Sequence, residues 1–205
     1  MSSYFFLSGL PPDLSPDDEP AADKDLAARL STFCTDLTQL ALDGKLSAAY
    51  GREKEVSEAL RALASPGALF PMLVGGPRGG KTTIAHQVAR CIAYNECPEP
   101  LKGMRVYETT PGRLLNGLGG MRRWMHALSG LLTSLTQANV VLFLRDFHTA
   151  LGLGTARFEE TGPDLAFMLS DLLQSVHPRL LLEARSRGLE RMFNTLPAAR
   201  NLFAP

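Results

Sequence analysis

The stretch that decides the fold is Gly75-Gly76-Pro77-Arg78-Gly79-Gly80-Lys81-Thr82, between an apolar run and a helical pattern. Its spacing is GxxxxGK[ST], the phosphate-binding P-loop. Glycines let the backbone wrap around a phosphate, and the following helix presents its positive dipole end to the same anion. Lys81 is expected to reach the β and γ phosphates of ATP or ADP, and the Thr82 hydroxyl to bind Mg²⁺. The expected nucleotide-binding residues of this loop are Gly75, Gly76, Pro77, Arg78, Gly79, Gly80, Lys81, Thr82 and Thr83.

Strand and helix patterns alternate on both sides of the loop. The clearest strand is the unbroken apolar run from Val140 to Leu144, which is typical of a central parallel strand. The alternation predicts an α/β fold with a parallel sheet. The expected strands are 68–74, 104–109, 139–144 and 180–184, and the expected helices are 25–46, 53–63, 82–94, 120–137, 163–176 and 188–194.

Composition narrows the classes of protein. Lys+Arg and Asp+Glu each count 21 in 205 residues, so the net charge is zero and no nucleic-acid partner is expected. The apolar start, Tyr4 to Leu7, has no basic flank and is too short for a signal peptide or a membrane span. The three cysteines have no CxxC spacing, which argues against a zinc site. We therefore expect a soluble, cytoplasmic protein.

The chain divides into two unequal parts. Residues 1–25 are rich in Pro, Asp, Ser and Ala and are expected to form a flexible acidic lead-in. Residues 26–205 are expected to form one nucleotide-binding domain that opens with a helical entry segment.

Several short motifs follow one another in an order that is typical of one protein family. They are Asp36-Leu37-Thr38, Gly44-Lys45-Leu46, Gly51-Arg52-Glu53, the P-loop, and the run VVLFLRDFHTALGLG at residues 140–154. Together these motifs resemble the first ATPase domain of the Clp unfoldases and disaggregases (ClpA, ClpB, ClpC and ClpV), which are AAA+ proteins. The resemblance covers residues 30 to 203. It implies that Tyr50 and Gly51 lie beside the adenine.

The resemblance also exposes departures from the family pattern. The family's Walker B strand ends in Asp-Glu, where this chain has Arg145-Asp146. Arg145 is expected to bind phosphate oxygens directly. Asp146 is expected to be a catalytic residue, or a Mg²⁺ residue if the strand bulges. The family's sensor 1 position falls at Arg185 or Ser186.

Other family features have no counterpart in the sequence. The paired arginines of the family's finger segment fall at Asn201 and Leu202, with Arg200 adjacent. The pore-loop aromatic is absent between Leu115 and Met121. No residues remain for the fifth strand or for the helical lid. The domain is therefore identified as a degenerate and truncated member of the Clp type.

The resemblance implies a three-layer P-loop NTPase fold of the AAA+ core type, with about four parallel strands in the order 1-4-3-2 and no lid. The strand before the P-loop would then lie at the edge of the sheet. Exposed strand edges invite pairing, so we expect self-association or association with a related Clp-type protein.

Three functions remain open at this point. The domain could bind ATP or ADP but hydrolyse it poorly, and so act as a nucleotide-dependent, chaperone-related interaction or regulatory module. It could be an active ATP-hydrolysing Clp-like subunit that oligomerisation completes. It could also be a structural remnant that binds no nucleotide.

Overall fold

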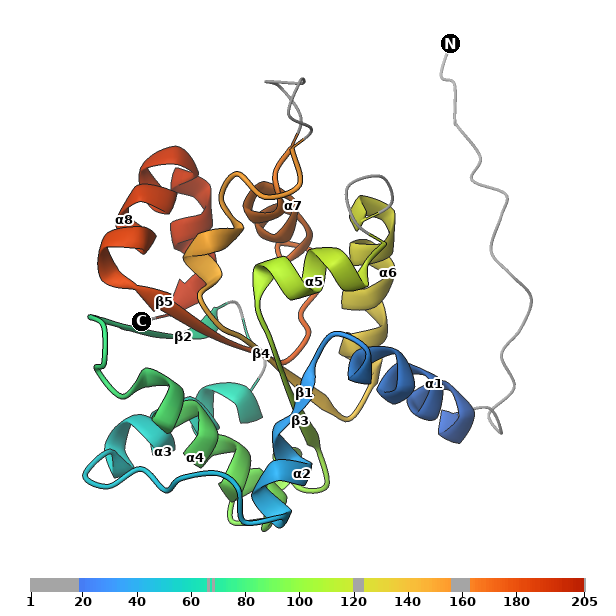
Figure 1. The fold of residues 1–205 in the computed structure, drawn as a ribbon, viewed down its shortest axis with the longest axis vertical. Helices are drawn as coiled ribbons and strands as arrows, with labels where there is room; N and C mark the ends of the chain where they lie inside the picture. The colour runs from blue at the N-terminus through green and yellow to red at the C-terminus, as the bar shows by residue number, and fades with distance from the viewer. Residues whose placement is uncertain (1–18, 66, 68, 120–123, 156–162, 205) are drawn as a thin grey trace.

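A twisted sheet lies at the centre of the protein (Figure 1). The structure is a computed structural model that describes residues 19–65, 67, 69–119, 124–155 and 163–204. The strand order is β1-β3-β4-β5-β2-β6. All neighbours pair in parallel except β1, which runs antiparallel to β3. The strands are β1 (Thr35–Asp36), β2 (Phe70–Gly75), β3 (Arg105–Thr109), β4 (Val140–Leu144), β5 (Leu180–Arg185) and β6 (Phe203–Ala204).

The four long strands confirm the predicted order, because 1-4-3-2 corresponds to β2-β5-β4-β3. The expected number of strands was too low. The two-residue strand β6 pairs with β2, placing Phe203 opposite Phe70, and β1 adds to the other edge. The expectation that the strand before the P-loop lies at the sheet edge is therefore wrong, and it gives no support to self-association. Two-residue strands are too short to carry a recognisable alternation.

The helices differ from expectation mainly at the N-terminal side. The expected helix 25–46 is two helices, because the Asp36 side chain caps a new one by accepting from the Gln39 amide at 2.9 Å. The first helix begins at Glu19, inside the expected lead-in, whose residues 1–18 lie outside the described part. The helices of this half are α1 (Glu19–Ser31), α2 (Leu37–Leu42), α3 (Glu53–Ala64) and α4 (Lys81–Ala93).

The C-terminal half contains one unexpected helix, α5, which begins at a proline after the capping residue Thr110. Of the expected helix 120–137, residues 120–123 lie outside the described part. The helices are α5 (Pro111–Gly117), α6 (Trp124–Gln137), α7 (Leu165–Leu172) and α8 (Ser186–Thr195). No helix in the described ranges is both long and apolar enough to cross a membrane.

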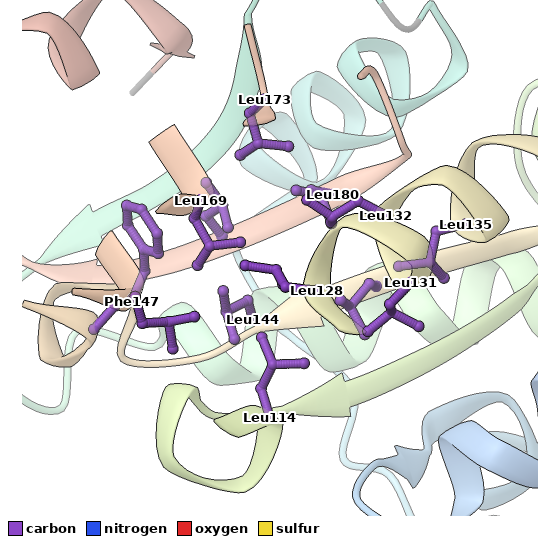
Figure 2. Packing of buried hydrophobic residues seen from close by; sticks show 14 of the residues in the cluster. Leu114, Leu128, Leu131, Leu132, Leu135, Leu144, Phe147, Leu169, Leu173 and Leu180 are labelled. Atoms are coloured by element: carbon purple, nitrogen blue, oxygen red, sulfur yellow. The ribbon is translucent and has the colours of Figure 1, made fainter. Parts of the chain in front are cut away.

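Each face of the sheet is covered by its own hydrophobic core, which gives three layers. Helices α2, α3 and α4 pack on one face, and α1, α5, α6 and α7 on the other (Figure 1). The core between the sheet and helices α1, α5, α6 and α7 is rich in leucine (Figure 2). Alternation along β4 divides its side chains between the two cores, with Val141 and Phe143 facing α4.

The same alternation places three charged side chains on the α4 face. Glu108 follows Val106 at a spacing of two, Arg145 follows Phe143, and Glu183 follows Leu181. All three lie at or just beyond the carboxyl ends of parallel strands. They are therefore carried to the edge where the P-loop joins β2 to α4.

Candidate nucleotide-binding site

The P-loop is a tight turn between β2, which ends at Gly75, and α4, which begins at Lys81. Gly80 takes a left-handed backbone with φ of 79°, a conformation that glycine adopts without strain. The Gly79 amide donates to the Gly76 carbonyl at 3.3 Å, and a Cβ on Gly79 would lie 3.2 Å from that oxygen. The loop therefore closes on itself as a phosphate-binding turn requires.

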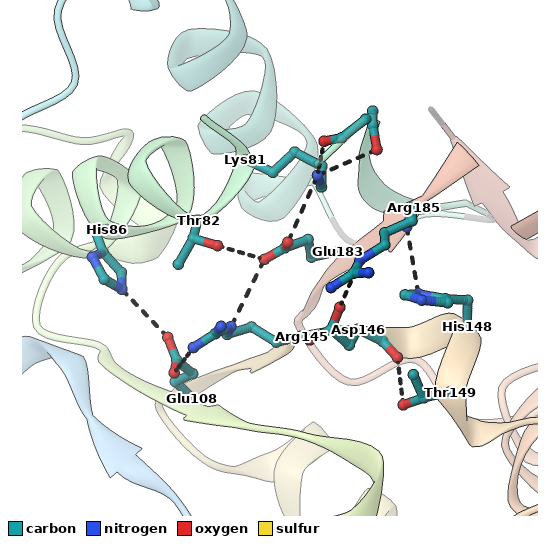
Figure 3. A network of polar contacts seen from close by, with 12 residues as sticks. Lys81, Thr82, His86, Glu108, Arg145, Asp146, His148, Thr149, Glu183 and Arg185 are labelled. Carbon is teal, nitrogen blue, oxygen red and sulfur yellow. Dashed lines mark hydrogen bonds and ion pairs between the residues drawn. The ribbon is translucent and has the colours of Figure 1, made fainter. Parts of the chain in front are cut away.

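Lys81 points at carbonyl groups of this turn, whereas Thr82 points at Glu183 on the neighbouring strand β5 (Figure 3). Lys81 is only 8% exposed, and its ammonium donates to the carbonyls of Gly76 at 2.8 Å and Gly75 at 3.3 Å. The Thr82 hydroxyl donates to Glu183 Oε2 at 3.0 Å. The structure thus brings together the two side chains that the sequence assigns to the phosphates and to Mg²⁺.

An open cavity of about 510 Å³ adjoins the start of the P-loop. Its lining includes Gly76 and Pro77 together with Arg185, Arg187 and Arg191, and carbon atoms form almost all of its exposed wall.

Arg145 lies between two carboxylates on neighbouring strands (Figure 3). It donates to Glu108 Oε1 at 3.0 Å, and its Nε is 3.9 Å from Glu183 Oε2. Burial acts to raise the pKa of Glu108, but hydrogen bonds with His86 and Arg145 outweigh burial and lower it. For Arg145, burial opposes the charge, yet Glu108 outweighs burial and raises its pKa. Both groups are therefore held in the charged state.

Asp146 follows directly after Arg145, and its carboxylate is paired with Arg185. Strand β4 keeps a continuous register with β3 as far as Leu144 opposite Thr109, so the strand does not bulge there. Asp146 follows in a left-handed conformation with φ of 49°. Its Oδ1 lies 3.8 Å from Arg185 Nε. Its catalytic role stays a prediction, as does direct phosphate binding by Arg145.

His148 fastens the end of β5 to the turn after β4. The Arg185 amide donates to His148 Nδ1 at 3.4 Å, and burial lowers the pKa of this imidazole. The ring packs so closely on α8 that a Cβ on Gly188 would lie 2.2 Å from His148 Cδ2. This contact holds the arginine-lined side of the cavity in place.

Gly188→Ala is expected to destabilise the protein by about 1–3 kcal/mol, because the added methyl overlaps the His148 ring. Gly130→Ala is a matched control, since Gly130 also lies in a helix and has no atom within 4 Å of the added Cβ. That control is expected to stabilise by about 0.5–1 kcal/mol, because alanine favours helix. Urea denaturation measures both. Equal effects of the two substitutions would contradict the close contact.

The loop expected beside the adenine is fastened to the P-loop helix. The Ala49 amide donates to Gln87, and Arg90 donates to the Leu46 carbonyl at 3.0 Å, both from α4. Tyr50 itself is 90% exposed. Tyr50 and Gly51 as adenine contacts stay a prediction.

The segment expected to correspond to the arginine finger forms a short 3-10 helix, Pro197–Leu202. The Arg200 guanidinium lies 5.3 Å from the centre of the Phe193 ring, within the same chain. Asn201 is exposed.

Two carboxylates of the site, Glu108 and Glu183, were not predicted from the sequence. Both are buried, and both contact other members of the site. Their signal was a charged residue two positions after a core residue that faces α4, Val106 in β3 and Leu181 in β5, which strand alternation could have revealed. Parallel pairing then brings such residues to one edge.

The side-chain oxygens at this site could hold Mg²⁺ only together with the phosphates of a bound nucleotide. The described residues contain no group of three or more His, Cys, Asp and Glu able to hold a metal ion by themselves. Thr82 and Glu183 do offer two oxygen ligands 3.0 Å apart. Mg²⁺ is commonly held in this way, by one or two protein oxygens with phosphates and waters completing the shell.

Comparison with known proteins places this site in a family context. No protein-family model matches the chain. The ClpC ATP-binding subunits of the ATP-dependent Clp protease from Staphylococcus saprophyticus and Staphylococcus aureus are each 34% identical to it over 146 residues. The match covers 71% of this chain but only 18% of each ClpC.

Solved structures of Hsp104 resemble the fold. A closed-state structure of Hsp104 with ATPγS and casein has a TM-score of 0.72 and 25% identity, covering 86% of this chain and 30% of that chain. Saccharomyces cerevisiae Hsp104 with ADP has a TM-score of 0.69 and 25% identity, covering 85% and 24%. The chain is thus homologous to the Clp-type AAA+ ATPase domain of ClpC and Hsp104, and it corresponds to part of those chains.

Proposed function

We propose that this domain binds ATP or ADP at its P-loop, hydrolyses ATP slowly, and acts as a nucleotide-dependent interaction or regulatory module of the chaperone-related class. The observation that carries the proposal is a division within the site. Lys81 points at the carbonyls of the phosphate-binding turn and Thr82 at Glu183, whereas Asp146 is paired with Arg185.

Binding is supported by the closed P-loop turn and by the open cavity beside it. The Hsp104 structures that the fold resembles contain ATPγS or ADP, which makes either nucleotide a reasonable ligand. In this proposal, the loop backbone and Lys81 hold the phosphates, and Thr82 ligates Mg²⁺.

Slow hydrolysis is proposed because phosphoryl transfer depends on positioning and charge stabilisation. Asp146 has a shorter side chain than the family's glutamate, and a guanidinium group 3.8 Å away competes for its carboxylate.

One observation favours the alternative that the protein is an active ATP-hydrolysing subunit completed by oligomerisation. Arg200 is held over Phe193 within the chain, so a cation from another subunit could still complete the site. We propose self-association or association with a related Clp-type protein, in the cytoplasm, as the setting for either function.

Steady-state turnover across a protein concentration series distinguishes these functions. We expect a rate below about 0.01 s⁻¹ at every concentration, at least about 100-fold under the lower end of typical turnover numbers. Asp146→Asn should leave both that rate and the affinity for ADP unchanged. Turnover that rises with protein concentration and disappears in Asp146→Asn would establish the active subunit instead.

A further inference from the structure

We infer that Glu183, on β5, holds the Mg²⁺ shell of the bound nucleotide, taking over from the end of β4, where Arg145 stands. The inference rests on the proposed nucleotide binding. In the family pattern, the aspartate that holds the metal follows β4, whereas Glu183 lies on β5.

The contact with Thr82 gives Glu183 its role. In P-loop NTPases, Mg²⁺ lies between the loop's Ser or Thr hydroxyl and an aspartate from a neighbouring strand. Here Glu183 Oε2 accepts from the Thr82 hydroxyl at 3.0 Å. A metal ligated by Thr82 would therefore have the Glu183 carboxylate as its neighbour, close enough to accept from a metal-bound water.

Strand order explains how Glu183 reaches this position. Strand β5 lies directly beside β2, with Glu183 opposite Leu73, two residues before β2 ends in the P-loop. The alternation along β5 turns Glu183 toward α4, whose first turn carries Thr82. The carboxylate thus approaches from the adjacent strand, whereas β4 lies one strand further away.

Arg145 cannot serve the metal, because its positive charge would repel Mg²⁺. Glu108 accepts from Arg145 at 3.0 Å, whereas the Arg145–Glu183 contact is longer, at 3.9 Å. Glu108 therefore provides Arg145 with its main counter-charge and leaves Glu183 available to another cation.

The charge balance also calls for a second cation at Glu183. This carboxylate is only 7% exposed, and its nearest ammonium is that of Lys81 at 3.9 Å. When Lys81 turns to a phosphate, the carboxylate keeps only Arg145, which also lies at 3.9 Å and is shared with Glu108. A buried charge with so little compensation is costly, and a Mg²⁺ ion arriving with the nucleotide would take the place of Lys81.

The test measures Mn²⁺ binding to the protein with ADP by electron paramagnetic resonance, since Mn²⁺ takes the same oxygen ligands as Mg²⁺. Glu183→Gln keeps an acceptor for Thr82 and removes only the charge. We expect Mn²⁺ to bind this variant about 10- to 100-fold more weakly, the usual effect of losing a group that orients metal ligands. ADP affinity measured in EDTA should not fall. Glu190→Gln, an exposed position on α8, should match the wild type.

Two further variants distinguish loss of the Glu183 charge from a defect in folding. Glu183→Asp retains the charge and should bind Mn²⁺ more tightly than Glu183→Gln, which guards against a purely folding defect. Arg145→Asp with Glu183→Gln returns a carboxylate to the end of β4 and should recover Mn²⁺ binding.

Three outcomes would overturn the inference. Unchanged Mn²⁺ affinity in Glu183→Gln would do so, as would tight ADP binding by the wild type with no effect of the metal. Absence of ADP binding both with Mn²⁺ and in EDTA would overturn the proposed function as well, so the two failures can be told apart.

Discussion

Replacing Lys81 with alanine is expected to remove the stabilisation of this protein by ATP. A ligand at 100 times its dissociation constant stabilises the native state by about 2.7 kcal/mol, which raises the melting temperature of a domain of this size by about 5–10 °C. Lys81 is the ammonium directed at the mouth of the P-loop. Its loss should leave no ATP-dependent shift at the same concentration. Differential scanning calorimetry measures the shift.

Two controls make this result specific to the site. Each variant is compared with its own nucleotide-free melting temperature, because removing a buried lysine also changes the resting fold. Lys54→Ala changes an exposed lysine on α3 and should retain the full shift. An undiminished shift in Lys81→Ala would mean that ATP binds elsewhere.

Trp124→Ala is expected to destabilise the fold by about 3–5 kcal/mol, the range for removing a large buried aromatic side chain. Trp124 opens α6 and is 1% exposed within the leucine-rich core. Its ring fits so closely against Gly154 that a Cβ there would lie 2.7 Å from Trp124 Cζ2. Circular dichroism during urea unfolding measures the change, because this is the only tryptophan and fluorescence is lost with it.

Met125→Ala is the matched control for that experiment. Met125 is the next residue of the same helix and is 42% exposed. Its replacement should change the free energy of unfolding by less than about 0.5 kcal/mol, as for most surface positions. A loss at Trp124 no larger than the loss at Met125 would contradict its place in the core.

Most of the fold could be predicted from periodicity and from the P-loop. Long apolar strands such as Val140–Leu144 have a clear pattern, and the family resemblance implied the order of the four long strands. The short strands β1 and β6 could not be predicted, because two residues carry no period and depend on a distant partner for pairing. The break before α2 was missed because Asp36 interrupts a sequence that still keeps helical spacing around it.

The candidate site was predicted only in part. The P-loop is local in sequence, so a turn followed by a helix that begins with Lys81 and Thr82 could be predicted from spacing alone. The network of Glu108, Arg145 and Glu183 joins three strands, and strand register decides which side chains meet. The sequence therefore drew attention to Arg145 as an isolated departure, whereas the structure surrounds it with carboxylates.

The most direct test of the central claim is a single-turnover experiment with protein in excess over Mg·ATP, in which bound nucleotide is separated and identified by chromatography. We expect protein-bound nucleotide of which more than about nine-tenths is still ATP after about 10 s, as a rate below about 0.01 s⁻¹ requires. Complete conversion to ADP in that time, or no nucleotide bound to the protein at all, would contradict it.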